Sequence, residues 1–221
     1  MNTPGPDGVV RDFTGTATLF LLPFDPATQE TAGPPIELEG LPSSWSPDGT
    51  QLLVASATSV RPELRILDNP ASDERRWVFS TFREDFARRY PRPTCAHFSP
   101  DGAWIVFGAS KERHRPAIFV VRRGSDDPRL LWEGSGFPAP SSDPERILIN
   151  SERGDETDGK LGFVPFDPIA GVATGDFQVI ELPGIPGAPI DNDCFMTRDR
   201  RWRLCAVEEV EGDIYVADVE R

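Results

Sequence analysis

Few residues in this sequence are of types that could act in catalysis, and their spacing matches no known catalytic arrangement. The only histidines are His97 and His114, and neither has a partner at a spacing that indicates a zinc site or a base for a nucleophile. We expect structural or solvated roles for both, with His97 facing away from the side that Phe98 packs on. A Gly-x-Ser-x-Gly nucleophile motif is absent. The sequence therefore predicts no catalytic residue in this chain, which we interpret as non-enzymatic.

Metal and cofactor sites are equally unsupported by residue spacing. Acidic runs occur at 155–158 and 191–193, but neither matches the Asp-x-Asp-x-Asp-Gly calcium loop, so we expect solvated loop carboxylates. Cys95, Cys194 and Cys205 are odd in number and lack Cys-x-x-Cys spacing, which argues against a disulfide framework and a zinc site. Buried free thiols are the expected state of these cysteines. We predict no metal and no cofactor.

The richest binding chemistry lies in the segment 69–92, which mixes aromatic residues with arginines as interface hot spots do. Its aromatics recur every four residues near its end and predict a short amphipathic helix over 81–90. Two interpretations stay open: the aromatics cover the edge of a sheet, or the segment binds a partner. The candidate partner-binding patch consists of Trp77, Phe79, Phe82, Phe86, Arg88, Arg89 and Tyr90.

Composition limits the classes of partner and compartment. The chain has 221 residues and a net charge of -13, which disfavours nucleic acid and anionic membrane surfaces. No apolar stretch is long enough to span a membrane, and residues 1–15 do not resemble a signal peptide. We expect no membrane insertion. The compartment is open: cytoplasmic for the sequence as it stands, or periplasmic or cell-envelope if its beginning is truncated.

One tetrapeptide occurs twice with the same surroundings, and it identifies the element that positions everything else. Each copy follows an aromatic residue and precedes an apolar run, as expected of a type I turn between two antiparallel strands, the second buried on both faces. A third strand is expected at 61–68, 115–122 and 213–218. The two turns are Ser46, Pro47, Asp48, Gly49 and Ser99, Pro100, Asp101, Gly102.

A second internal echo sets the size of the unit. Residues 16–42 resemble residues 158–186 at a nearly constant offset, so both are expected to be the third and fourth strands of equivalent units. Turn aspartates at Asp7, Asp48, Asp101, Asp143 and Asp199 mark repeats close to the length of a four-stranded propeller blade. The sequence predicts a single all-β domain over 1–221, with approximate blades at 1–40, 41–92, 93–134, 135–184 and 185–221.

The motif of an aromatic residue, Ser-Pro-Asp-Gly and an apolar strand, with Ile-Tyr-Val-x-Asp at 214–218, resembles the Pro-Asp variant of the WD-like repeat. This variant is found in TolB-type β-propellers and in the propellers of prolyl-oligopeptidase-like enzymes. The resemblance is strongest over 43–122. It implies four-stranded antiparallel blades, either about five of them or a fragment of a six- or seven-bladed ring.

Function is less specified than fold, because the same turn serves scaffolds and enzyme lids. The leading hypothesis is a non-catalytic TolB-like scaffold that binds a protein or peptide of unknown identity. One alternative is the gating propeller of a serine hydrolase whose catalytic domain lies outside this chain. Another is a propeller that binds a small ligand or calcium.

Overall fold

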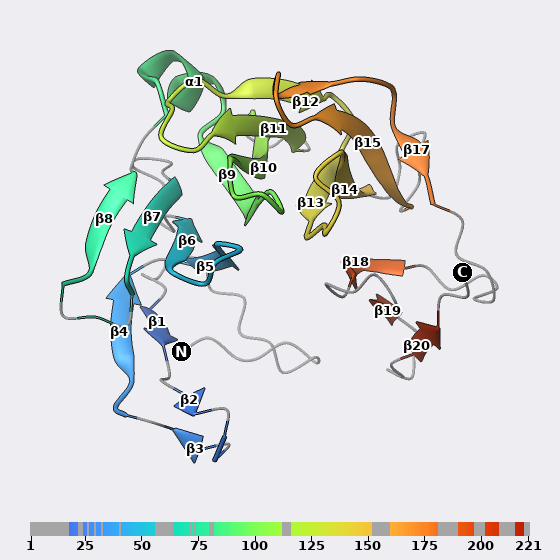
Figure 1. Cartoon of the computed structure of the whole chain (residues 1–221). Helices are drawn as coiled ribbons and strands as arrows, with labels where there is room; N and C mark the ends of the chain where they lie inside the picture. Colours follow the sequence, from blue (N-terminus) through green and yellow to red (C-terminus); the bar gives the residue numbers. More distant parts are fainter. Residues whose placement is uncertain are drawn as a thin grey trace, which may run out of the picture.

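The computed structural model describes residues 18–21, 24–25, 27–28, 30–31, 33–39, 41–55, 64–70, 72, 74–79, 82–111, 116–151, 160–180, 190–196, 202–207 and 215–218. Within these ranges the protein is all-β, with antiparallel sheets and one short helix. Figure 1 shows the sheets fanned around a common centre, as blades of a propeller are. The predicted fold class is therefore confirmed.

Two four-stranded sheets carry the two identical tetrapeptides. The 41–79 sheet has the order β5-β6-β7-β8, and the 92–132 sheet has the order β9-β10-β11-β12. Their strands are β5 (Leu41–Trp45), β6 (Gln51–Ala55), β7 (Leu64–Asp68), β8 (Arg76–Phe79), β9 (Arg92–Phe98), β10 (Trp104–Ser110), β11 (Ala117–Arg122) and β12 (Arg129–Trp132).

The remaining strands form one larger and several smaller sheets. In the 136–179 sheet β14 lies between β13 and β15, and β15 also pairs with β16 and β17; β18, β19 and β20 form a three-stranded sheet; β1 pairs with β4 and β2 with β3. Their bounds are β1 (Thr18–Leu21), β2 (Phe24–Asp25), β3 (Glu30–Thr31), β4 (Ile36–Glu39), β13 (Gly136–Ala139), β14 (Arg146–Ser151), β15 (Leu161–Asp167), β16 (Val172–Ala173), β17 (Gln178–Val179), β18 (Ile190–Met196), β19 (Trp202–Val207) and β20 (Tyr215–Asp218).

The first strand of each sheet lies toward the common centre. β5 contacts β9, β9 contacts β13, and β13 contacts β18, while β8, β12 and β17 lie on the outside (Figure 1). The sheets therefore face one another side by side, and each pair of neighbours encloses an interface. The division into five units at the predicted boundaries stays a prediction.

The two tetrapeptides fold into the same hydrogen-bonded turn. The Gly49 N–H donates to the Ser46 carbonyl at 2.8 Å, and the Gly102 N–H donates to the Ser99 carbonyl at 2.8 Å. Both glycines have a positive φ, 72° and 69°, which a residue with a Cβ adopts only with strain. Each turn joins two antiparallel strands, β5 to β6 and β9 to β10, as the motif predicts.

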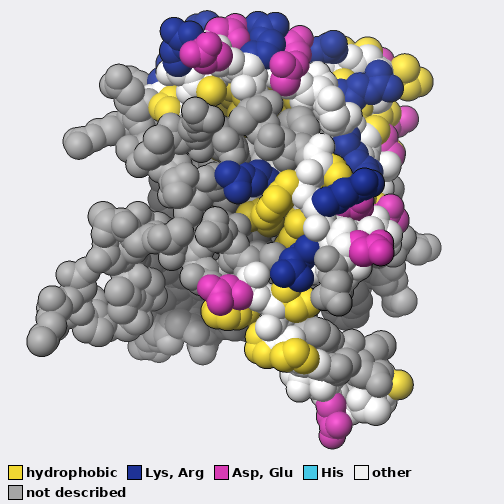
Figure 2. All heavy atoms as spheres, turned by 90° about the vertical axis from the view of Figure 1, so that its left-hand side faces the viewer, with side chains coloured by type: hydrophobic (Ala, Val, Ile, Leu, Met, Phe, Trp, Pro, Cys, Tyr) yellow, Lys and Arg dark blue, Asp and Glu magenta, His cyan; other side chains and the backbone are white. Residues whose placement is uncertain are grey.

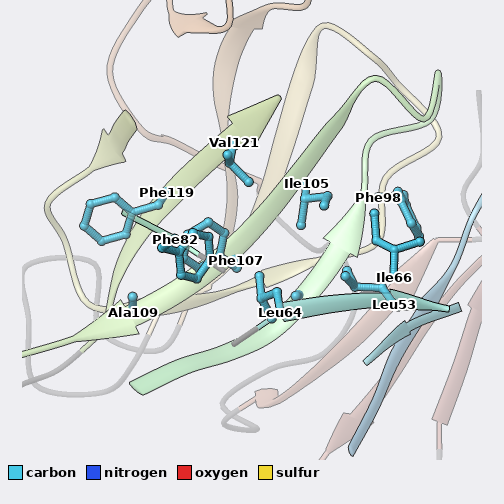
Figure 3. Close-up of a cluster of buried hydrophobic side chains, with 11 residues drawn as sticks. Leu53, Leu64, Ile66, Phe82, Phe98, Ile105, Phe107, Ala109, Phe119 and Val121 are labelled. Carbon is cyan, nitrogen blue, oxygen red and sulfur yellow. The ribbon is translucent and has the colours of Figure 1, made fainter. Parts of the chain in front are cut away.

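The strand after each turn is buried on both faces because it lies between two neighbouring sheets. Alternate residues of β10 point to opposite interfaces: Ile105 and Phe107 pack with Leu53 and Ile66 of the 41–79 sheet, while Val106 packs with the 136–179 sheet. Figure 3 shows the first of these clusters, with side chains of both sheets interleaved. Burial on both faces explains why these strands are apolar throughout rather than alternating.

The predicted echo is a true structural repeat with one register. The pair Phe24↔Thr31 recurs 142 positions later as Phe166↔Ala173, and Leu21↔Ile36 recurs as Phe163↔Gln178. In both places a short hairpin with two residue pairs precedes the fourth strand: β2 pairs with β3 in the first copy, and the end of β15 pairs with β16 in the second. Equivalent strand pairs thus come from two segments with only loosely similar sequences.

The predicted helix is present but shorter, as α1 (Glu84–Arg89). Arg83 before it is extended, with φ -51° and ψ 145°, and Tyr90 after it leaves the helical region. Acidic residues in its first turn and basic residues in its last turn suit the helix dipole. One cysteine expectation is wrong: the Cys95 thiol, which forms no disulfide, is exposed rather than buried, because it lies at an irregularity of β9 where the chain takes a positive φ of 46°.

Candidate functional site

The predicted patch divides into a buried part and an exposed part. Phe82 is buried and stacks on Phe107 at a centroid distance of 4.8 Å, while Phe86 and Tyr90 are half-buried against the same core cluster. Phe86 also meets Phe119 edge to face at 5.0 Å. These three aromatics therefore close one end of the interface between the 41–79 and 92–132 sheets.

Trp77 supplies the exposed part, on the outermost strand β8. Its side chain is 40% exposed, and the next residue, Val78, is 45% exposed. The Arg65 guanidinium lies over the Trp77 ring at 5.6 Å, a cation–π contact that orients the indole. Arg76 pairs with Asp68 at 3.2 Å. Phe79 also lies on β8, and its side chain is outside the described part of the structure.

The outer surface of α1 is charged and tied to the 92–132 sheet. Arg88 pairs with Glu84 at 3.0 Å, and the exposed Arg89 lies over the Tyr90 ring at 5.6 Å. Arg83 bonds Asp85 at 2.8 Å, which lowers the pKa of that carboxyl, and reaches Asp127 at 3.1 Å. Figure 2 shows Lys and Arg side chains over the top of this face, with hydrophobic side chains lower down.

A groove of about 540 Å³ lies next to this face, between the 41–79 and 92–132 sheets. One wall combines apolar side chains with an amide, and the other combines the second tetrapeptide turn with two arginines. The lining residues are Gln51, Ile66, Val78, Asp101, Gly102, Ala103, Arg122, Arg123 and Gly124. Val78 thus belongs both to the exposed surface of β8 and to the groove.

The aspartates of the two turns are held in place by hydrogen bonds within each turn. The Ser46 hydroxyl and the backbone and hydroxyl of Thr50 donate to Asp48 Oδ1 at 2.6, 3.0 and 2.8 Å. These bonds, the one from Ser46 foremost, lower the pKa of Asp48 to about 2, and the nearby Arg123 adds a small effect. In the second turn the Ala103 N–H donates to Asp101 Oδ1 at 3.0 Å.

Sequence reasoning missed Arg122, Arg123 and Gln51. Arg122 ends β11, Arg123 follows it, and Gly124 comes next with a φ of 82°, which makes a tight turn; this is a common surface pattern with no functional signal. The opposing groove wall comes from the neighbouring sheet, which is distant in the chain. An alignment of the two repeats would have shown that Gln51 occupies the position that Trp104 has in the next unit.

The other candidate residues are not assembled into a site. Burial lowers the pKa of His97 to about 4, although its ring N–H donates to the Pro138 carbonyl, so it is neutral at pH 7. His114, the run 155–158 and the side chains of 191–193 lie outside the described residues. Where side chains are described, no group of three His, Cys, Asp or Glu could hold a metal. The described residues also include no helix long and apolar enough to cross a membrane.

No protein-family model matches the sequence, and no curated protein matches it. Solved structures do match. TolB from Acinetobacter baumannii superposes with a TM-score of 0.58 at 18% identity, over 96% of this chain and 54% of that one. The chain has the TolB-type β-propeller fold. A structure described as TolB from Agrobacterium tumefaciens agrees, with a TM-score of 0.57 at 18% identity over 80% of this chain and 56% of that one. The chain thus spans about half the length of these TolB-type propellers.

Other matches show how widely this propeller fold is used. Kuenenia stuttgartiensis hydrazine synthase superposes with a TM-score of 0.52 at 18% identity, over 83% of this chain and 48% of that one. A prolyl endopeptidase gives 0.50 at 16% identity, over 90% of this chain and 31% of that one. At these identities the likeness concerns fold alone. The gating-propeller and calcium-binding alternatives therefore stay untested predictions.

Proposed function

We propose that this TolB-type propeller is a non-catalytic scaffold that binds a protein or peptide on the outer face formed by β8 and α1. The observation that carries the proposal is the exposure of two adjacent large apolar side chains, Trp77 and Val78, on an edge strand. Trp77 lies opposite Leu67 of β7, whereas Val78, at a register shift of β8, lines the groove together with Ile66. Apolar surface is therefore available on both faces of the edge.

The chemistry of the face suits a protein or peptide partner. Tryptophan and arginine are the residue types most enriched at binding hot spots, and here Arg65 already holds the indole in place. An edge strand also presents unpaired backbone N–H and C=O groups to an incoming chain. The buried ring of Phe82 and the half-buried ring of Phe86 fix α1 to the core, so the face is a rigid support rather than a loop.

A selection for peptide ligands tests the proposal directly. A phage-displayed random decapeptide library is selected on the immobilised full chain, and the enriched peptides are titrated against variants by fluorescence anisotropy. Trp77→Ala should weaken binding by about tenfold, since a hot-spot side chain contributes at least ~1.4 kcal/mol. Ile169→Ala is the matched control, because Ile169 is a 91% exposed apolar residue of the β15–β16 hairpin. Failure to enrich any peptide, or equal loss in both variants, would contradict the proposal.

A further inference from the structure

Gln51 and Trp104 occupy equivalent positions in successive sheets. The backbone N–H of each donates to the hydroxyl of its turn serine at 2.9 Å, Ser46 in one turn and Ser99 in the other. Each also begins the second strand of its sheet, opposite Asp68 or Arg122 on the third. Each side chain therefore points toward the interface with the following sheet, and Gln51 and Trp104 can be compared directly.

At the interface between the 92–132 and 136–179 sheets, Trp104 fills this position. Its indole N–H donates to the Pro168 carbonyl at 2.7 Å, and its ring meets Phe166 edge to face at 5.8 Å. A Cβ on Gly171 would overlap the indole, so the opposing hairpin has closed onto the ring. We call this the filled interface.

At the interface between the 41–79 and 92–132 sheets, Gln51 leaves the same position open. The side chain is only 8% exposed, and its Nε2 donates to Asp68 at 3.3 Å. Its Oε1 is buried, with no hydrogen-bond partner in the described part of the structure, an arrangement that destabilises the fold until a donor is supplied. The groove lies against this amide. We call this the open interface.

Two arginines without ion pairs line the open interface. The exposed Arg122 and Arg123 have no carboxylate within 4.0 Å among the described residues. By contrast, Arg76 pairs with Asp68, Arg83 with Asp85 and Asp127, and Arg88 with Glu84. The carboxylates nearby are Asp101, which lines the groove, Asp48, whose pKa Arg123 helps to lower, and Asp68, which accepts from Gln51. Asp48 and Asp101 each accept bonds within their own turn, and Asp68 pairs with Arg76. The two groove arginines are therefore the charged groups here that have no partner of opposite charge among the described residues, and they would attract an anion.

We propose that the groove of the open interface binds an acidic peptide segment. A carboxylate of the segment pairs with Arg122 and Arg123, an N–H donates to Gln51 Oε1, and an apolar side chain covers Ile66 and Val78. Guanidinium groups suit a carboxylate because they present paired N–H donors to its two oxygens. This inference rests on the proposed function, which supplies the class of ligand, a peptide. It adds that the peptide is acidic and that it binds in the groove.

The composition of the selected peptides tests this inference. In the decapeptide selection described above, the enriched sequences should contain more Asp and Glu than the input library. Replacing those residues by Asn and Gln should then weaken binding by about tenfold. Enriched peptides that depend on Trp77 but are neutral or basic would overturn the acidic-peptide site and leave the proposed function standing. No enrichment at all would overturn both.

Variants of the groove locate the site. Arg122→Glu with Arg123→Glu should weaken the acidic peptides by about tenfold or more. The charge-matched control is Arg129→Glu with Arg146→Glu, two exposed arginines that line neither the groove nor the β8 and α1 face, and it should change affinity less than about twofold. Gln51→Trp, which copies the filled interface, should abolish binding by occupying the groove. Thermal unfolding and circular dichroism check that each variant is folded. Equal losses for the two double variants, or full binding by Gln51→Trp, would overturn the proposal.

Discussion

The sheets that precede the open and the filled interface carry the same turn and the same strand register. They differ at the first residue of the second strand. Where that residue is Trp104, an indole ring bridges to the next sheet and bonds a backbone carbonyl. Where it is Gln51, the sheets stay joined by the aliphatic and aromatic cluster deeper in, and a groove remains. The repeat thus supplies equivalent positions. The side chain at that position and the connection facing it, the β15–β16 hairpin in one case and the short β11–β12 turn in the other, decide whether the position joins the sheets or borders a groove.

The largest effect is expected from converting the filled interface into an open one. Trp104→Gln removes a ring packed on Phe166 and Gly171 and leaves the Pro168 carbonyl without its donor. We expect a loss of about 4 kcal/mol in the free energy of unfolding, measured by urea denaturation. A loss below about 1 kcal/mol would show that the indole does not hold the two sheets together.

Phe82→Ala tests how the open interface keeps its stability without a tryptophan. Phe82 is buried and stacks on Phe107, so its removal leaves a cavity at the end that α1 closes. We expect the free energy of unfolding to fall by about 3 kcal/mol. Trp77→Ala, an exposed aromatic of the same segment, is the control and should change it by less than about 1 kcal/mol. Similar losses of unfolding free energy in the two variants would contradict the division of the patch into a buried and an exposed part.

His97 sharpens the comparison through pH, because it joins β9 to β13 at the inner end of the filled interface. Its pKa is lowered to about 4 in the fold, against an ordinary 6.5, so the unfolded chain binds the proton more readily. The stability that the neutral ring contributes is present above pH 6.5 and is lost as pH falls toward 4. We expect a loss of about 2 kcal/mol over this range, and urea denaturation of His97→Gln should show a flatter profile. An unchanged profile would contradict the assignment.

The smallest effect is expected from converting the open interface into a filled one. Gln51→Trp removes a buried carbonyl that lacks a partner and places apolar surface in the groove, while losing the bond to Asp68. The free energy of unfolding should stay within about 1 kcal/mol of the parent. A loss above about 3 kcal/mol would show that the groove cannot accept the ring and that the two positions are equivalent in backbone only.

The fold was predictable because its determinants are local. Pro47 and Gly49 set a turn whatever surrounds it, and Leu52, Leu53 and Val54 indicate a strand buried on both sides. The division of the patch was not predictable, since the spacing of Phe82 and Phe86 gives a shared face but not what that face contacts. The groove was not predictable either, because Gln51 and Arg122 line it from two different sheets and neither is unusual in its own segment.

The β2–β3 hairpin has a practical consequence. It projects away from the rest of the molecule in Figure 1, and Ala27 and Thr28 at its tip are exposed. Its counterpart 142 residues later, β15–β16, contacts Trp104, so an insertion there would disturb the filled interface. A fluorophore or a surface-attachment tag inserted between Ala27 and Thr28 would instead attach the propeller to a sensor chip through an element that contributes no residue to the groove.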